Sequence, residues 1–201
     1  MVTVFDVANF ILKSRQDTTA WQLQKLCYYS KAWGLVLINN GIFDEPFEAW
    51  ANGPVCRTLY YKHKGRHSIP RDFLTPYSKY SLAEEEESLV EAVLEQYGKM
   101  TGEELKELSH SEIPWKITRG ELPDDVKCNK RIEDSIIKEY YSHQYDDLEK
   151  IDNIMLTRIA DKRLSGDYET VSFEEMMSRF GITAEDLDDV EAEFEVEPIV
   201  F

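Results

Sequence analysis

Three neighbouring polar side chains, Ser109, His110 and Glu112, are of the types that form a nucleophilic catalytic triad. In a triad the histidine takes the proton of the serine while the carboxylate orients the imidazole, so the three groups must converge in space. Close neighbours on one irregular loop rarely achieve this. The pattern therefore favours a structural role, in which His110 and Glu112 bind backbone groups and Trp115 fills the core. A hydrolase that uses His110 stays a remote alternative.

A second group, Trp50, Asn52, Gly53, Pro54 and Val55, has two interpretations. These residues could line a partner-binding surface. Alternatively, Gly53 makes a tight turn and Pro54 starts a helix, where its missing N–H costs nothing. The spacing slightly favours the turn, and both interpretations stay open.

The cysteines and histidines show no metal-binding pattern. Cys27, Cys56 and Cys128 are widely spaced and form no CxxC pair, and the four histidines form no HExxH. Three cysteines are also no disulfide framework. We therefore expect no metal and no cofactor, and we expect Cys27 to be a buried small hydrophobe.

The elements that position these residues are predicted to be helices. A capping box of Thr3 and Asp6 opens the first helix. The second begins near Thr18 or Thr19 and carries an apolar stripe of Leu23, Leu26, Cys27, Ser30, Trp33 and Leu37. Further helices are expected from Pro54, from the Ser81 capping box, over 101–108 and over 132–140, with irregular segments at 65–80 and 110–129. Residues 1–145 are thus predicted to form an all-α domain.

Charge is spread unevenly along the 201 residues. The chain has 39 acidic and 23 basic residues, a net charge of −16, and 17 acidic against 5 basic residues fall in 146–201. Such a balance argues against direct nucleic-acid binding, which needs clustered cations. No apolar run is long enough to span a membrane, and the N-terminus lacks the pattern of a signal peptide. The expected location is the cytoplasm.

The acidic segment 146–201 forms a C-terminal extension of short amphipathic helices with an extended end at 193–201. Pieces this small make little core of their own. They could fold back on the domain, or they could wrap a partner and order on binding. The candidate partner-binding residues are Phe173, Met176, Met177, Phe180, Leu187 and Phe194.

Three blocks together resemble a known family. Leu23–Trp33, Phe47–Val55 and Glu107–Trp115 are similar to the Panacea domain, the SocA-like antitoxin domain of phage and bacterial toxin–antitoxin systems. The likeness covers roughly residues 5–142. Its motif residues here are Trp50, Asn52, Gly53, Pro54, Val55, Ser109, His110, Glu112 and Trp115, with Ser109 where a typical member has threonine. The resemblance implies a helical domain that neutralises a toxin encoded beside it.

The extension has a resemblance of its own. Ala160–Ile182 is similar in texture to the toxin-binding ends of RelB-like and Phd-like antitoxins. Both resemblances imply an antitoxin rather than an enzyme, whose partner is the toxin of an adjacent gene, in a homo-oligomer or a hetero-oligomer. The alternative that they allow is an adaptor that delivers the toxin to a protease.

Overall fold

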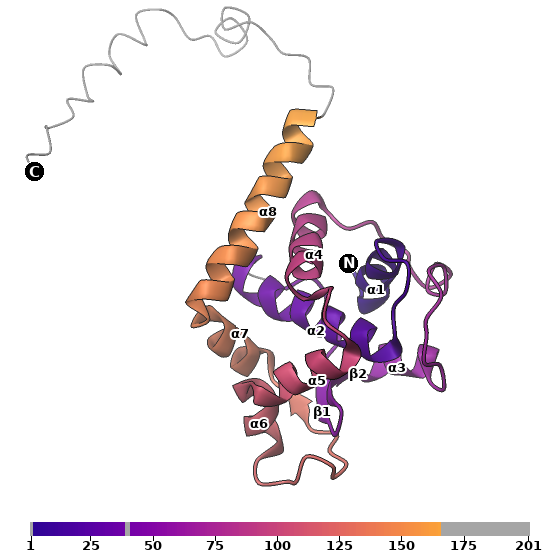
Figure 1. The fold of residues 1–201 in the computed structure, drawn as a ribbon, viewed down its shortest axis with the longest axis vertical. Coiled ribbons are helices and arrows are strands. Elements are labelled where there is room, and N and C mark those ends of the chain that lie inside the picture. The colour runs from indigo at the N-terminus through magenta and orange to yellow at the C-terminus, as the bar shows by residue number, and fades with distance from the viewer. Residues whose placement is uncertain (1, 39–40, 166–201) are drawn as a thin grey trace, which may run out of the picture. The chain divides into compact units, whose positions relative to one another are not determined.

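The computed structural model describes residues 2–38 and 41–165 (Figure 1). The helices are α1 (Val4–Lys13), α2 (Ala20–Leu37), α3 (Arg57–His63), α4 (Glu84–Tyr97), α5 (Gly102–Ser111), α6 (Ile113–Arg119), α7 (Asp134–Ser142) and α8 (Tyr145–Ser165). The strands are β1 (Phe47–Trp50), β2 (Gly53–Cys56) and β3 (Arg131–Ile132). The mainly helical prediction is confirmed, and the strands add one small three-stranded sheet to the helices. The extension from residue 166, with its candidate partner-binding residues, lies outside the described residues.

Helix α2 is the centre of the domain. The Thr19 hydroxyl caps its first turn by accepting from the Gln22 backbone N–H. Helices α1, α4, α5 and α7 all pack against it, so it is buried on nearly every side between Ala20 and Leu35. Trp33 is fully buried and its indole N–H donates to the Tyr97 hydroxyl at 3.1 Å. The predicted stripe is therefore part of a helix that is buried almost all round. All three cysteines are free and buried, as expected for Cys27.

The sheet replaces the predicted helix start at Pro54. Strand β1 lies in the middle, antiparallel to β2 and to β3, and the β1–β2 turn pairs Trp50 with Gly53. Gly53 has a φ of +89°, a left-handed conformation that favours glycine. Pro54 lies in the edge strand β2, where proline's missing N–H is tolerated. Helix α3 begins only at Arg57.

Two other boundaries differ from the prediction. Residues 110–129 were expected to be irregular, but α6 forms with Pro114 in its first turn, where a proline leaves no helical hydrogen bond unmade. Helix α4 starts at Glu84 rather than at Ser81, and the Ala83 N–H donates to the Glu86 carboxylate at 2.7 Å. The Thr101 and Glu104 capping box forms at the start of α5.

Helix α8 belongs to the compact unit that runs to Leu164. Its buried side chains, Ile151, Met155 and Ile159, join the core. Basic residues of α8 pair with acidic residues of α4, including Arg158 with Glu95 at 2.6 Å. The helical prediction for this part of the extension is confirmed. Within 2–38 and 41–165, no helix is long and apolar enough to cross a membrane.

Candidate functional site

The three sequence blocks that were singled out meet at one corner of the domain, which we call the hairpin corner: Lys25 of α2, the β1–β2 turn, and α5–α6. The buried Lys25 ammonium donates to the Asn52 carbonyl at 2.6 Å and to the Pro54 carbonyl at 3.1 Å. A Cβ added to Gly53 would lie 2.6 Å from Lys25 Cε and 2.7 Å from Ser109 Oγ. Any side chain at position 53 would therefore collide with Lys25 and Ser109, so the packing of the corner favours glycine there.

Lys25 is a buried charged residue of the corner that the sequence pattern did not single out. Burial, and secondarily the nearby Lys106 charge, lower the pKa of Lys25 to about 7. Its two hydrogen-bond acceptors are backbone carbonyls, so its role is to hold the turn on α2. A signal for this was present in part: Lys25 lies between Leu23 and Leu26 of the predicted apolar stripe.

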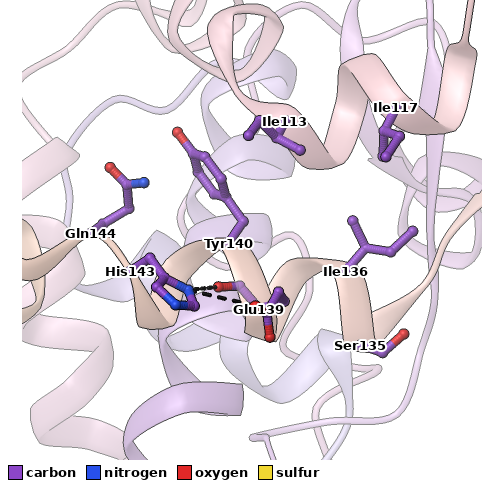
Figure 2. A pocket seen from close by; sticks show the side chains of 8 residues that line it. All are labelled: Ile113, Ile117, Ser135, Ile136, Glu139, Tyr140, His143 and Gln144. Carbon is purple, nitrogen blue, oxygen red and sulfur yellow. Dashed lines mark hydrogen bonds and ion pairs between the residues drawn. The ribbon is translucent and has the colours of Figure 1, made fainter.

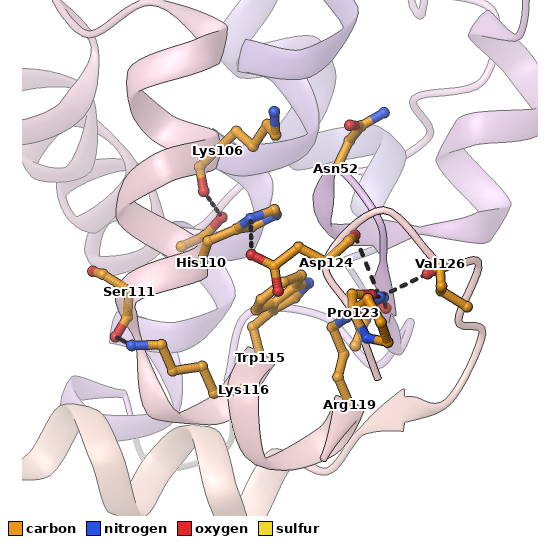
Figure 3. Close-up of polar contacts among 12 residues, drawn as sticks. Asn52, Lys106, His110, Ser111, Trp115, Lys116, Arg119, Pro123, Asp124 and Val126 are labelled. Carbon is orange, nitrogen blue, oxygen red and sulfur yellow. Dashed lines mark hydrogen bonds and ion pairs between the residues drawn. The ribbon is translucent and has the colours of Figure 1, made fainter. Parts of the chain in front are cut away.

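Trp115 links the turn to α5 and α6 (Figure 3). It is buried, as predicted, and its indole N–H donates to the Trp50 carbonyl at 2.9 Å. The His110 ring stacks on it with centroids 3.7 Å apart, and the Arg119 guanidinium lies 4.8 Å from its centroid on the same indole. This stack ties the helix pair to the hairpin.

Arg119 completes the corner as a buried cation that binds backbone. Its guanidinium donates to the carbonyls of Ala49 in β1 and of Pro123, Asp124 and Val126 in the loop after α6. It thereby fixes that loop against the hairpin. The sequence did not single out this residue, because the segment that carries it was expected to be irregular.

His110 faces a small surface hollow of about 430 Å³, lined by Ala51, Asn52, Lys106, His110, Asp124 and Asp125. Its Nδ1 is 3.9 Å from an Asp124 carboxylate oxygen. Burial lowers the pKa of His110 to about 4, opposed by Asp124 and reinforced by the charges of Lys25, Lys106 and Arg119. The imidazole is therefore neutral at pH 7.

Ser109, His110 and Glu112 do not assemble into a triad. The Ser109 hydroxyl donates to the Lys106 carbonyl at 2.9 Å. His110 and Glu112 were expected to bind backbone groups, and this is wrong for both. The His110 ring stacks on Trp115 and faces the Asp124 carboxylate. Glu112 accepts from the hydroxyls of Tyr29 at 3.3 Å and Tyr141 at 2.8 Å.

Burial raises the pKa of Glu112 to about 8, while the two tyrosine hydrogen bonds act in the opposite direction. The carboxyl is therefore mostly protonated at neutral pH. The three triad-type residues thus have separate partners: Ser109 bonds within α5, His110 stacks on Trp115 of α6, and Glu112 joins α2 to α7. Within the described ranges, no group of acidic, histidine and cysteine side chains could hold a metal ion.

The other side of α6 is different in character. Ile113 and Ile117 of α6 face Ile136 and Tyr140 of α7 across an open cavity of about 640 Å³ (Figure 2). Ser135, Glu139, His143 and Gln144 complete the lining. We call this cavity the α6–α7 groove. Nothing in the sequence analysis identified it, because α6 itself was not predicted.

The helical core and the small three-stranded sheet bring the three sequence blocks together at the hairpin corner. Residues 23–116, a little under half of the chain, match the family described as antitoxin SocA-like, Panacea domain. This stretch is therefore similar to a SocA-like Panacea antitoxin domain, and the resemblance seen in the sequence is confirmed over residues 23–116. The RelB-like or Phd-like texture of the extension is not part of this match. No curated protein and no solved structure matches the chain.

Proposed function

We propose that this chain is the antitoxin of a toxin–antitoxin pair and that it neutralises a protein toxin by binding it directly. The observation that carries the proposal is the Panacea domain over residues 23–116. The hairpin corner supports a binding role over catalysis, since Ser109, His110 and Glu112 do not bond to one another there. The toxin is proposed to be the product of the adjacent gene.

The acidic extension is proposed to contribute as a toxin-binding arm. Its negative charge would speed association with a basic toxin surface, because exposed charges act mainly on the on-rate. Affinity would come from its apolar residues, since hot spots are usually buried aromatic or apolar groups. These proposed contacts are Phe173, Met176, Met177, Phe180, Leu187 and Phe194.

Co-expression tests the function. The neighbouring reading frame should stop growth when expressed alone, and this chain should restore growth and co-purify with its product. A neighbour that is harmless alone, or that stays toxic beside this chain, contradicts the proposal. Restored growth in wild-type cells that is lost in protease-deficient cells would indicate an adaptor instead of a direct inhibitor.

A truncation separates the arm from the domain. A chain ending at Ser165 retains all the described helices and strands, so we expect its melting temperature to stay within a few degrees of the full-length value. Neutralisation by this truncation should be lost if the arm holds the toxin. Full neutralisation by residues 1–165 would instead place recognition on the folded domain.

A further inference from the structure

The α6–α7 groove is lined by apolar side chains that are spaced for a helical partner. Ile113 and Ile117 lie one turn apart on α6, and Ile136 and Tyr140 lie one turn apart on α7. Ile113 is 53% exposed and Ile117 is 61% exposed, although both are large apolar residues. Two such residues side by side on a seven-residue helix indicate an interaction surface rather than a random surface exposure.

The dimensions of the groove match a short helix. Helix α7 has nine residues, which corresponds to about 13 Å of groove wall. A partner helix of two to three turns would cover that length and would present apolar residues at positions i, i+3 or i+4, and i+7. Figure 2 shows Ile117 of α6 and Ile136 and Tyr140 of α7 directed into the open space between the helices.

The acidic side chains at one end of the groove favour an occupant with positive charge at that end. Glu139, with a side chain 79% exposed, lies on the wall, and the groove's His143 and Gln144 continue into a second hollow that Asp146 and Asp147 help to line. In that hollow the Lys150 ammonium pairs with the Asp147 carboxylate at 3.5 Å. The neighbouring Asp146 is exposed, and Lys150 does not pair with it. An occupant with basic residues beside its apolar face is favoured here.

The same charges disfavour the two occupants that this chain could supply. Residues 166–201 contain 12 acidic residues and one basic residue, so the chain's own extension would bring like charge to the acidic end. A second copy would bring a chain of net charge −16 to the same end. A different protein, with the opposite charge, fits both the shape and the electrostatics.

We propose that the α6–α7 groove is a second toxin-docking surface, on the folded domain, and that it receives an amphipathic toxin helix with basic residues at one end of its apolar face. This inference rests on the proposed antitoxin function. It adds a surface that is independent of the C-terminal arm. Glutamate at Ile113 would put a charge into the apolar wall, and lysine at Glu139 would reverse the acidic end.

The experiment measures binding of the full-length chain to the purified product of the adjacent reading frame. Ile113→Glu should raise Kd by about tenfold or more, because it buries a charge in the interface. Glu139→Lys should slow association several-fold and weaken its salt dependence. Tyr61→Glu is the matched control, since Tyr61 is 60% exposed but lies on α3, away from both the groove and the extension; its Kd should stay within about twofold. Ile117→Ser provides a second groove variant if Ile113→Glu loses its helical circular dichroism.

Each result has a definite meaning. Weakened binding for Ile113→Glu and unchanged binding for Tyr61→Glu supports the groove. Equal binding by Ile113→Glu, Ile117→Ser and the unmodified chain overturns the groove while the antitoxin function stands. A groove variant that only changes a dimer into a monomer shows that a second copy is the occupant, and this also overturns the proposal. Absence of any binding by the unmodified chain contradicts the antitoxin function itself, and the groove proposal with it.

Discussion

The two faces of α6 take part in two regions with opposite chemistry. Trp115 and Arg119 point into the hairpin corner, where polar groups of four elements bind one another. Ile113 and Ile117 point the other way, into a groove where apolar side chains face solvent. The difference teaches that the polar motif residues hold the domain together, whereas the surface proposed for a partner is mainly apolar and contains none of those motif residues. Four predictions test that division.

The largest expected effect is the loss of the Trp115 side chain. Trp115→Ala should lower the free energy of unfolding by about 3–5 kcal/mol, because it removes a buried indole that packs on His110 and Arg119 and donates to Trp50. Chemical denaturation measures the effect. Trp21→Ala is the matched control: Trp21 is 42% exposed, so about 1 kcal/mol or less is expected. Equal costs at both positions would contradict a scaffold role for the corner.

Gly53→Ala should have the next largest effect. It combines the strain of a side chain at φ +89° with a collision against Lys25 and Ser109, for a cost of about 2–4 kcal/mol. Gly65→Ala is a sharp control, because Gly65 has a similar φ of +81° but no neighbouring atom within 4 Å of an added Cβ. Its cost should be about 1–2 kcal/mol, from backbone strain alone. A smaller cost at Gly53 than at Gly65 would mean that the corner is loosely packed.

The buried Glu112 and Lys25 should each make the free energy of unfolding depend on pH, with opposite signs. The pKa of Glu112 is raised from 4.5 to about 8, so the unfolded chain loses this proton first and stability falls as pH rises between these values. The pKa of Lys25 is lowered from 10.5 to about 7, so the unfolded chain keeps its proton longer and stability rises with pH between about 7 and 10.5. Each contribution reaches at most about 1.4 kcal/mol per pH unit.

Urea denaturation across pH 4–10 measures both contributions. Glu112→Gln should remove the falling part of the profile, and Lys25→Met should remove the rising part. The groove variant Ile117→Ser should leave both parts in place, since its side chain contacts neither group. A profile that is unchanged by Glu112→Gln would show that this carboxyl has an ordinary pKa in the folded chain.

The smallest effect is expected in the groove. Ile117→Ala should lower the free energy of unfolding by less than about 1 kcal/mol, because the side chain is mostly exposed in the folded domain. The same substitution should weaken toxin binding if the groove is a docking surface. A stability loss comparable to that of Trp115→Ala would place Ile117 in the core and remove the contrast between the two faces of α6.

The sequence predicted the helices with clear periodicity and capping. The Thr3 and Thr101 capping boxes form, and the burial of Trp33 follows from its place in the apolar stripe. Errors arose at prolines. Pro54 and Pro114 carry the same local signal, yet one lies in an edge strand and the other in the first turn of a helix, because pairing with β1 decides the first case.

The candidate site was predictable only in part. Its motif residues were found, but Lys25, Arg119 and the tyrosines around Glu112 were not. Their roles depend on acceptors that lie far away in the chain: Lys25 binds Asn52 and Pro54, and Arg119 binds Ala49. No local pattern encodes a contact between a side chain and a distant backbone carbonyl. The groove was missed for the same reason, since it exists only where α6 meets α7.

The labelling rates of the three buried thiols can report how fast different parts of the fold open. Cys27 lies in α2, Cys56 ends β2, and Cys128 lies in the loop before β3, so they report on three different parts of the fold. Burial raises the pKa of the Cys27 and Cys56 thiols, which keeps both in the unreactive protonated form while the fold is closed. A thiol reagent therefore labels each site only as fast as that part of the structure opens. Mass spectrometry of the labelled peptides would rank the central helix, the hairpin and the Arg119-bound loop by their opening rates, without any engineered probe.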